Sequence, residues 1–436
     1  GVMQALSVFR GGFTREAAAH VAGATLHDLR ALADKSLLQL GSAPSTWLRT
    51  GGRYEIHELL RQYAAERLGE VPGARETAKD RHCAYYAQLL HTREADLIGR
   101  HQREALAEIE GEIENVRAAW NWAVDQGKIE EIDRSLESLA EFYCIRARFQ
   151  EGEQAFARAA QRLAREQSDM ASRPEVSRES RIVLGKVLLQ QGRFCDPLGL
   201  AEKGVELFQK SLAILRDLDA RREMAYALCY LCHLGEKPLC QEALAIFEEI
   251  GDRRGIALCL RGLADFLAGE YGAGRQLVQE SLAIFRELGN QKEIATSLHR
   301  LGWVAWLLGE CEVARDLHQE SLVLYQEIGD QSGVADSLEY LGLDVLYGFK
   351  EYGEAKQLFQ ESLAIHEEIG NLYGMSVALP SLGEIALVLG EYAEAAQLAQ
   401  KGLILAEKCS DPTQVPVCLR VLGLAACGLG DLKGAR

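Results

Sequence analysis

Apolar residues recur through most of the chain at spacings of three and four positions, which is typical of helices with one buried face. In residues 292–308 these positions are held by Ile294, Leu298, Leu301, Val304 and Ala305. Gly309-Glu310 interrupts the pattern, and a second amphipathic stretch, residues 312–328, ends at Gly329-Asp330. Because glycine commonly ends a helix, the pattern predicts two helices, A and B, joined by a short turn.

The helix pair repeats with a period of about 40 residues. Residues 279–285, Gln-Glu-Ser-Leu-Ala-Ile-Phe, have close counterparts at 319–325 and 360–366 and weaker ones at 209–215, 241–247 and 400–405. Three markers keep one phase over four copies: Leu282, Leu322, Leu363 and Leu403; Leu301-Gly302, Leu341-Gly342, Leu382-Gly383 and Leu422-Gly423; and the small residues Gly274, Ala314, Ala355 and Ala395. One pair cannot bury its apolar face alone, so the pairs are expected to stack. The sequence therefore predicts an all-α superhelix whose concave face is lined by the A helices.

Two details of the repeat concern its local geometry. The glycine inside helix A costs helix stability, so its recurrence at one phase predicts that two helices cross closely there. The earlier units are less regular, with an insertion around residues 193–202 and a shortened helix A or turn near residues 233–239. We expect the superhelix to be irregular at those two places.

Residues 1–70 lack the repeat and predict a different module. Thr14 precedes a helix at residues 15–22 as its cap, a second helix covers 26–35, and short strands cover 36–40 and 53–57. Glycine, serine, proline and threonine between the strands are typical of a hairpin turn, and a helix at 58–68 completes the module. Helix, helix, hairpin and helix is the order of a winged-helix domain.

Both parts resemble known families. Leu-Gly in helix A, Gly-Glu-Tyr at the turn (residues 269–271 and 390–392) and Ala and Leu in helix B resemble tetratricopeptide repeats, in the long variety of the sensor arms of bacterial signalling ATPases. The N-terminal sequences LSVFRGGFTREAAAHVAG and RYEIHELLRQYAAERL resemble the winged-helix domain of STAND ATPases of the NB-ARC type, which include the AfsR and MalT regulators. Residues 81–124 resemble the helical linker of the same proteins.

The resemblance implies three domains and a further one outside the chain. They are a winged-helix domain (1–72), a helical linker (73–175) and a tetratricopeptide-like solenoid (176–436). In the family a nucleotide-binding domain precedes the winged helix, and no Gly-x-x-x-x-Gly-Lys-Ser/Thr loop for phosphates occurs here. The chain starts at the edge of the winged helix and ends within a repeat. We therefore expect it to be the non-catalytic regulatory part of a larger protein.

Composition and charge narrow the range of partners. The 436 residues carry a formal net charge of −16, and an acidic surface disfavours nucleic acid and anionic membranes. The chain has no apolar run long enough to span a membrane and no signal peptide. Its 11 cysteines are an odd number, scattered through helical patterns. These features favour a cytoplasmic protein with reduced thiols and without a cofactor.

Two motifs that indicate chemistry have simpler interpretations. Cys229-x-x-Cys232-His233 matches a haem-attachment pattern, and Cys240 could add a metal ligand. Cys232, however, takes the small-residue position that Gly302 holds in a later unit, which explains it by packing. Residues 1–70 carry 8 Lys and Arg against 7 Asp and Glu, so the winged helix lacks the basic excess of a DNA-binding module. We favour packing over haem or zinc, and we expect no direct contact with DNA.

The candidate binding residues are the A-helix positions that face the groove in tetratricopeptide repeats. Transferred to this chain, the resemblance gives Tyr226, His233, Arg261, Asp265, His299, Trp303, Trp306, Asp336, Glu339, Tyr347, Glu384 and Arg420. Aromatic side chains among mixed charges suit the capture of a peptide or other ligand. For Trp303, ligand binding in the groove and packing in the solenoid interior are equally supported. For Trp306, interior packing is favoured.

These features favour a sensor arm that binds a protein, a peptide or a small-molecule inducer in its groove and controls an upstream nucleotide-binding domain. A stand-alone adaptor and the regulatory part of a transcriptional activator are the alternatives. No catalytic set of residues is visible in the sequence. A phosphate-binding loop upstream of this chain would discriminate the sensor arm from the adaptor.

Overall fold

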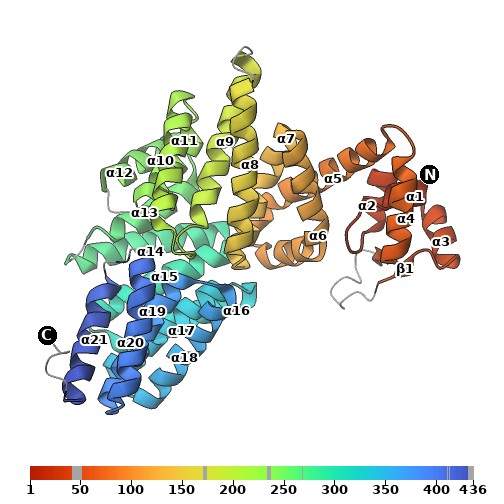
Figure 1. Cartoon of the computed structure of the whole chain (residues 1–436). Helices are drawn as coiled ribbons and strands as arrows, with labels where there is room; N and C mark the ends of the chain where they lie inside the picture. The colour runs from red at the N-terminus through yellow and green to blue at the C-terminus, as the bar shows by residue number, and fades with distance from the viewer. Residues whose placement is uncertain are drawn as a thin grey trace. The chain divides into compact units, whose positions relative to one another are not determined.

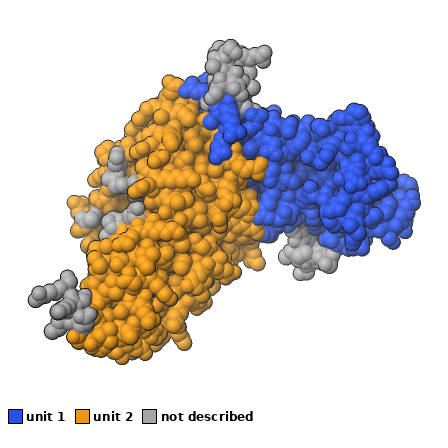
Figure 2. All heavy atoms as spheres, viewed as in Figure 1, with its two compact units in different colours: residues 1–97, 104–139, 161–183 blue, residues 98–103, 140–160, 184–436 orange. Residues whose placement is uncertain are grey.

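The structure is a computed structural model, and it describes residues 1–41, 52–169, 174–232, 237–267, 269–409, 411 and 413–430, apart from the side chains of 166–169 and 174–177. The chain is all-α with one small hairpin, as predicted (Figure 1). It divides into two compact units (Figure 2): unit 1 comprises residues 1–97, 104–139 and 161–183, and unit 2 comprises residues 98–103, 140–160 and 184–436. Among the described residues, no helix is long and apolar enough to cross a membrane.

Unit 1 begins with the predicted order of helix, helix, hairpin and helix, preceded by one short helix. Its first elements are α1 (Val2–Leu6), α2 (Arg15–Ala22), α3 (Leu26–Asp34), β1 (Gln39–Leu40), β2 (Tyr54–Glu55) and α4 (Glu58–Gly69). The antiparallel strands place Gln39 opposite Glu55 and Leu40 opposite Tyr54. Both strands are shorter than the sequence predicts, and the predicted hairpin tip, residues 42–51, lies outside the described residues.

Local chemistry explains how this module forms. The Thr14 side chain accepts a hydrogen bond from the Ala17 amide at 3.1 Å, so it caps α2 as predicted. Gly23 ends α2 with a φ of 65°, a left-handed conformation that favours glycine. Phe13 and Tyr54 exchange two backbone hydrogen bonds of 2.9 Å, which attach the hairpin to the segment before α2.

The long helices that follow are α5 (Ala74–Leu97), α6 (Gln102–Gln126), α7 (Ile129–Ile145), α8 (Phe149–Asp169) and α9 (Pro174–Arg193). Within unit 1, a buried polar network ties α5 and α6 to the N-terminal module. Glu112 of α6 accepts hydrogen bonds from the Tyr86 hydroxyl at 2.8 Å and from Arg53 of the hairpin. Asn115 donates to the Gly12 carbonyl at 2.9 Å. Breaking these bonds would leave unpaired polar groups in the core, which is costly.

Unit 2 consists mainly of helical hairpins that follow one another from α10 to α21 (Figure 1). Its A helices are α11 (Arg221–Cys232), α13 (Arg253–Ala264), α15 (Gln291–Leu307), α17 (Gln331–Leu343), α19 (Leu372–Val388) and α21 (Gln414–Gly428). Its B helices are α10 (Ala201–Asp217), α12 (Lys237–Ile250), α14 (Tyr271–Leu288), α16 (Cys311–Ile328), α18 (Tyr352–Ile369) and α20 (Tyr392–Lys408). The predicted insertion lies in the connection between α9 and α10, and α11 and α13 are shorter than α15.

Four of the turns from a B helix to the next A helix repeat one design, namely those that lead into α13, α15, α17 and α19. A glycine with positive φ precedes an Asp or Asn cap at Gly251-Asp252, Gly289-Asn290, Gly329-Asp330 and Gly370-Asn371. Each cap side chain accepts a hydrogen bond of 2.9 to 3.1 Å from the amide three residues later. Because the same cap starts α13, α15, α17 and α19, these four A helices begin in the same way.

The single 41-residue spacing in the repeat has a structural cause. Between the markers Leu341 and Leu382, the segment Asp344–Phe349 is π-helical, and a π-helical segment takes up one extra residue. Lys350 then adopts a φ of 60°, at the turn where Gly309 and Gly390 lie in the neighbouring units. The extra residue is therefore absorbed before the turn, and the period of 40 resumes after it.

The close crossing predicted at the Leu-Gly pairs is confirmed. A methyl group on Gly302 would lie 2.5 Å from Nε2 of His318, and one on Gly342 would lie 3.0 Å from the Phe359 ring. His318 cannot move aside easily, because it is fully buried and its Nδ1 pairs with the Asp344 carboxylate at 2.6 Å.

We expect Gly302→Ala to destabilise the protein by about 1–3 kcal/mol, because the added methyl group overpacks the crossing. Helix propensity alone would favour alanine by about 1 kcal/mol, so the sign of the effect is diagnostic. Gly272→Ala in α14 is the control, since nothing lies within 4 Å of its Cβ position. Urea unfolding followed by circular dichroism measures both variants. Equal stabilities would contradict the close crossing.

Candidate binding face of the A helices

The A helices of unit 2 form a layer, because α11 contacts α13, α15 contacts α17, α17 contacts α19 and α19 contacts α21. Most of the predicted binding residues lie on this layer. We define the A face as the surface formed by Arg261, Asp265, His299, Arg300, Trp303, Trp306, Asp336, Glu339, Tyr340, Tyr347, Glu384 and Arg420. Of the remaining predicted residues, Tyr226 lies on α11, and His233 lies outside the described residues.

Aromatic side chains meet at the centre of the A face. The rings of Trp303 and Trp306 stack with centroids 5.0 Å apart, and Trp303 meets Tyr340 of the next A helix edge-on at 5.5 Å. His299 contacts the same tyrosine at 4.3 Å, and Trp306 lies 6.2 Å from Tyr347. Both tryptophans are half-buried, so they pack against their neighbours and still present part of their surface.

The charged groups at the N-terminal end of the A face are paired within the fold. Arg261 lies 2.7 Å from Glu293, and both side chains are nearly buried. Asp265 pairs with Arg300 at 3.3 Å. Tyr226 also has a partner within the fold, because its hydroxyl donates a hydrogen bond of 3.1 Å to the carboxylate of the Asp252 cap. This part of the predicted site therefore has its main polar groups occupied.

The acids at the middle of the A face differ, because Asp336 and Glu339 of α17 lie next to each other without strong partners. Glu339 is 5% exposed, and burial raises the pKa of its carboxyl well above the usual range, with a further contribution from Asp336. Burial, followed by repulsion from Asp330, raises the pKa of Asp336 to about 7. The Asp336 side chain is nevertheless 49% exposed, and its Oδ1 lies 3.8 Å from Nε2 of His366, which is neutral because burial lowers its pKa to about 4.

The C-terminal end of the A face is a hydrogen-bonded chain across three elements. The Tyr347 hydroxyl, in the π-helical segment, donates to Glu384 of α19, and Arg420 of α21 pairs with the other oxygen of the same carboxylate. Tyr347 is 49% exposed, and Arg420 is exposed as well. This arrangement fixes Tyr347 and leaves its ring open to solvent.

A carboxylate from outside the repeats lies buried against the A helices of unit 2. Glu141, near the end of α7, is 4% exposed and lies 2.9 Å from Arg193, 3.6 Å from Lys292 and 3.8 Å from Arg254. Burial acts to raise the pKa of Glu141, but Lys292, Arg193 and Arg254 outweigh it and hold that pKa far below its usual range. The end of α7 is thereby tied to α9, α13 and α15.

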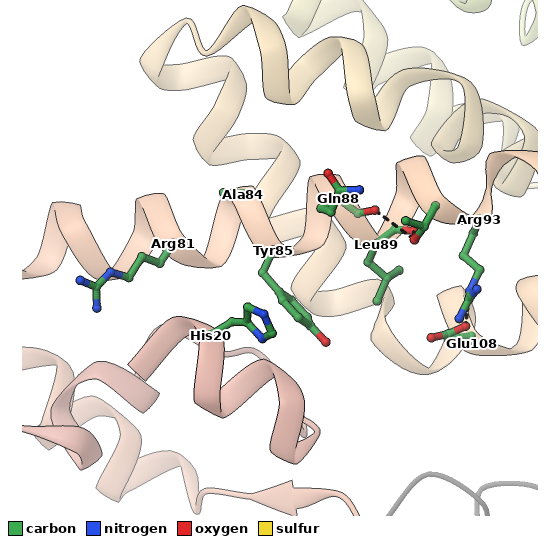
Figure 3. Close-up of a pocket in the computed structure, with 9 residues that line it drawn as sticks. His20, Arg81, Ala84, Tyr85, Gln88, Leu89, Arg93 and Glu108 are labelled. Atoms are coloured by element: carbon green, nitrogen blue, oxygen red, sulfur yellow. Dashed lines mark hydrogen bonds and ion pairs between the residues drawn. The ribbon is translucent and has the colours of Figure 1, made fainter. Parts of the chain in front are cut away.

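A pocket of about 510 Å³ lies in unit 1, between α2 and α5 (Figure 3). His20 and Tyr85 face each other across it with ring centroids 5.3 Å apart. Arg93 pairs with Glu108 at one end, and the Thr92 hydroxyl donates to the Gln88 carbonyl at 3.1 Å. These lining groups are bonded within the wall of the pocket, so we place the candidate site on the A face instead.

The cysteines singled out in the sequence lie in the core of unit 2. Cys229, Cys232, Cys240 and Cys259 are each at most 2% exposed and pack among the apolar residues of α11, α12 and α13. Hydrogen bonds with neighbouring thiols, followed by burial, raise the pKa values of Cys232 and Cys259, so these thiols resist ionisation. Within the described ranges, no group of three or more His, Cys, Asp and Glu residues could hold a metal ion.

Three residues of this region, Arg300, Tyr340 and Glu141, were not predicted from the sequence. Tyr340 directly precedes a Leu-Gly pair, and an aromatic residue at that place was a usable signal for it. Glu141 lies outside the repeats, and nothing in the sequence connects it with Arg193 or Lys292, because only the folded chain brings them together.

Comparisons with known proteins give the fold a family context. The family model "Tetratricopeptide repeat" matches residues 257–327, so the tetratricopeptide interpretation is confirmed for this segment. Over 279 residues, the chain is 28% identical to a "Putative HTH-type transcriptional regulator" of Mycobacterium tuberculosis (strain ATCC 25618 / H37Rv) and equally to one of Mycobacterium bovis (strain ATCC BAA-935 / AF2122/97). These alignments cover 59% of this chain and 30% of each relative, so the chain spans under a third of their length.

Solved structures that resemble the chain do so remotely. One is a signal transduction ATPase with numerous domains and a tetratricopeptide repeat sensor from Pyrococcus horikoshii, with a TM-score of 0.44 and 15% identity, covering 96% of this chain and 64% of that one. Another is the apo form of the quorum sensor NprR from B. thuringiensis, with a TM-score of 0.48 and 14% identity, covering 76% and 93%.

We expect Glu339→Gln to be more stable than the unchanged protein at pH 8, by about 1 kcal/mol or more, and close to it at pH 4.5. Because the pKa of Glu339 is raised by folding, the folded state keeps a proton that the unfolded state loses above pH ~4.3. Stability therefore falls as the pH rises from there towards the pKa in the folded state, and glutamine removes that loss.

Urea unfolding midpoints across this pH range measure the effect, with Asp316→Asn on the exposed surface of α16 as the matched control. A Glu339→Gln protein that loses stability most at high pH would mean that the carboxylate is ionised and partnered in the folded state.

Proposed function

We propose that this chain is a regulatory arm that binds a peptide or a protein segment on its A face and thereby controls a nucleotide-binding domain of a longer, STAND-type protein. The observation that carries the proposal is the A face itself. Trp303 and Trp306 present part of their rings there, beside two carboxylates, Asp336 and Glu339, that the fold leaves without strong partners. Partly exposed aromatic residues in a recess supply much of the binding energy in interfaces.

The regulatory part of the proposal has separate support. Residues 1–125 resemble the winged helix and linker of STAND ATPases, and the observed order of elements in residues 1–69 agrees with that resemblance. The mycobacterial relatives are much longer than the matched part and are named as HTH-type transcriptional regulators. Their name favours transcription as the output, through segments that lie outside this chain.

Glu141 offers a physical route from the A face to the rest of the protein. Its partners Arg254 and Lys292 lie in the first turns of α13 and α15, the helices that carry Arg261 and Trp303. α7, which carries Glu141, runs from unit 1 into unit 2. A ligand that favours one position of these A helices would act on α7, and the shift would be limited by its difference in affinity for the two states.

We infer that the chain itself has no catalytic role. His318 and Asp344 have the geometry of a base and its orienting acid, with 2.6 Å between Nδ1 and the carboxylate. Both side chains are sealed in the core, at 0% and 1% exposed, so no substrate can reach them. Turnover of ATP by the purified chain would contradict this part of the proposal.

Selection from a random octapeptide library on the purified chain tests the proposal. We expect a family of related peptides to be enriched, and we expect Trp303→Ala to weaken their binding at least tenfold in fluorescence anisotropy, or about 1.4 kcal/mol. The control is Val323→Ala, which removes an exposed apolar side chain from the B helix α16. No enrichment, or equal losses in the two variants, would show that the A face is not the binding surface.

A further inference from the structure

We propose that the A face holds its peptide through a lysine or arginine side chain, which Asp336 and Glu339 bind beside Trp303 and Tyr340. This inference rests on the proposed function and names the chemistry of the ligand. Its basis is a contrast between these two carboxylates and the other buried acids of unit 2.

Glu339 is a buried acid without a partner. It is 5% exposed, and its carboxylate has no hydrogen bond or ion pair within the part of the chain that the structure describes. Its carboxylate oxygens are not fully sealed from solvent. The small exposed part of the Glu339 side chain therefore includes the carboxylate. Glu339 therefore combines nearly complete burial with a carboxylate that solvent, and hence a ligand, can still reach.

Other buried acids of unit 2 have their partners in place. Glu293 has Arg261, Glu141 has three cations, Asp344 has His318, and Asp330 accepts a hydrogen bond from the Gly333 amide at 3.1 Å. An ionised carboxylate that is buried without a partner costs several kcal/mol. Glu339 avoids this cost by keeping its proton, since burial raises its pKa, and a cation supplied by a ligand would favour the ionised form.

The charges around the two acids favour a cation. Three aspartates add negative charge to this region: Asp330 at the start of α17, Asp196 after α9 and Asp411 before α21. After burial, Asp330 and Asp196 raise the pKa of Asp336, and Asp411 and Asp196 raise the pKa of Tyr373 on α19. Arg300 of α15 is the cation that acts on Asp336 and Tyr340, and its guanidinium is held by Asp265 at 3.3 Å. Apart from Arg300 and the neutral His366, the charges around the two acids are negative, so this part of the A face attracts a positive group.

The aromatic wall selects the kind of cation. Trp303 and Tyr340 meet edge-on at 5.5 Å, and the acids lie close enough to act on Tyr340, whose pKa is raised by burial, then by Glu339 and Asp336. An ammonium or guanidinium group gains energy over an aromatic face, and the alkyl stem of lysine or arginine covers apolar surface while its head reaches a carboxylate. The rings continue through Trp306 to Tyr347, a row longer than one side chain. The occupant is therefore an extended peptide rather than a lone amine.

The peptides selected on the chain also test this inference, and they are expected to carry a lysine or arginine at one fixed position. Glu339→Gln and Asp336→Asn should each weaken their binding at least tenfold, and so should replacing the basic residue of the peptide by glutamine. Because these changes remove two sides of one contact, combining the peptide change with Glu339→Gln should cost little more than either alone.

Controls separate this contact from general attraction, since a net charge of −16 draws any basic peptide to the protein. Asp316→Asn removes one negative charge from the exposed surface of α16 and should change the affinity less than twofold. Thermal unfolding of each variant shows that it is folded, and Asp336→Asn, at an accessible side chain, serves if Glu339→Gln does not fold.

The outcomes distinguish this inference from the proposed function. Peptides that depend on Trp303 but show no fixed basic position, or that bind Glu339→Gln and Asp336→Asn as tightly as the unchanged protein, would overturn the inference and leave the proposed function standing. Full competition by millimolar arginine amide, with no preference among peptide sequences, would overturn the assignment to a peptide. A library without enriched peptides would overturn both.

Discussion

Unit 2 depends on the close crossing of helices that cannot cover their apolar faces alone. At Gly302 the crossing leaves no room for a methyl group, because the His318 ring lies directly against it. Asp or Asn caps after a left-handed glycine start four of the A helices, α13, α15, α17 and α19, in the same way. Together, these contacts align the A helices as one layer, and the A face exists only because that layer is regular. Any ligand bound there touches several hairpins and is sensitive to their relative positions.

The distribution of charge then gives different parts of this layer different roles. Towards its N-terminal end, Arg261 with Glu293 and Glu141 with its three cations satisfy one another, so these groups hold the fold together. On α17, Asp336 and Glu339 remain without such partners, beside the aromatic rings. Natural proteins break the rule of paired buried charges mainly at functional sites. A cation from a ligand would pair with the carboxylates on α17, as Arg261 pairs with Glu293 within the chain.

The sequence was sufficient for the repeat, the helix pairs and the crossing at the Leu-Gly pairs, because periodicity and glycine placement are local signals. It also placed Trp303, Asp336 and Glu339 by their phase in helix A. It could not show that Glu293 is paired and Glu339 is not, since that depends on which side chain the neighbouring helix presents. It gave no sign of Glu141 among the A helices, because the contact joins residues more than 100 positions apart. The π-helical segment was visible only as a spacing of 41, and the tip of the hairpin lies outside the described residues.

Hydrogen exchange of backbone amides, compared with and without a saturating basic peptide, tests most directly whether the A face is the recognition surface. The account predicts slower exchange in α15, α17 and α19, centred on the turns that carry Trp303 and Glu339, and little change in α14, α16 and α18. Protection confined to these B helices, or to residues 1–97 of unit 1, would contradict it.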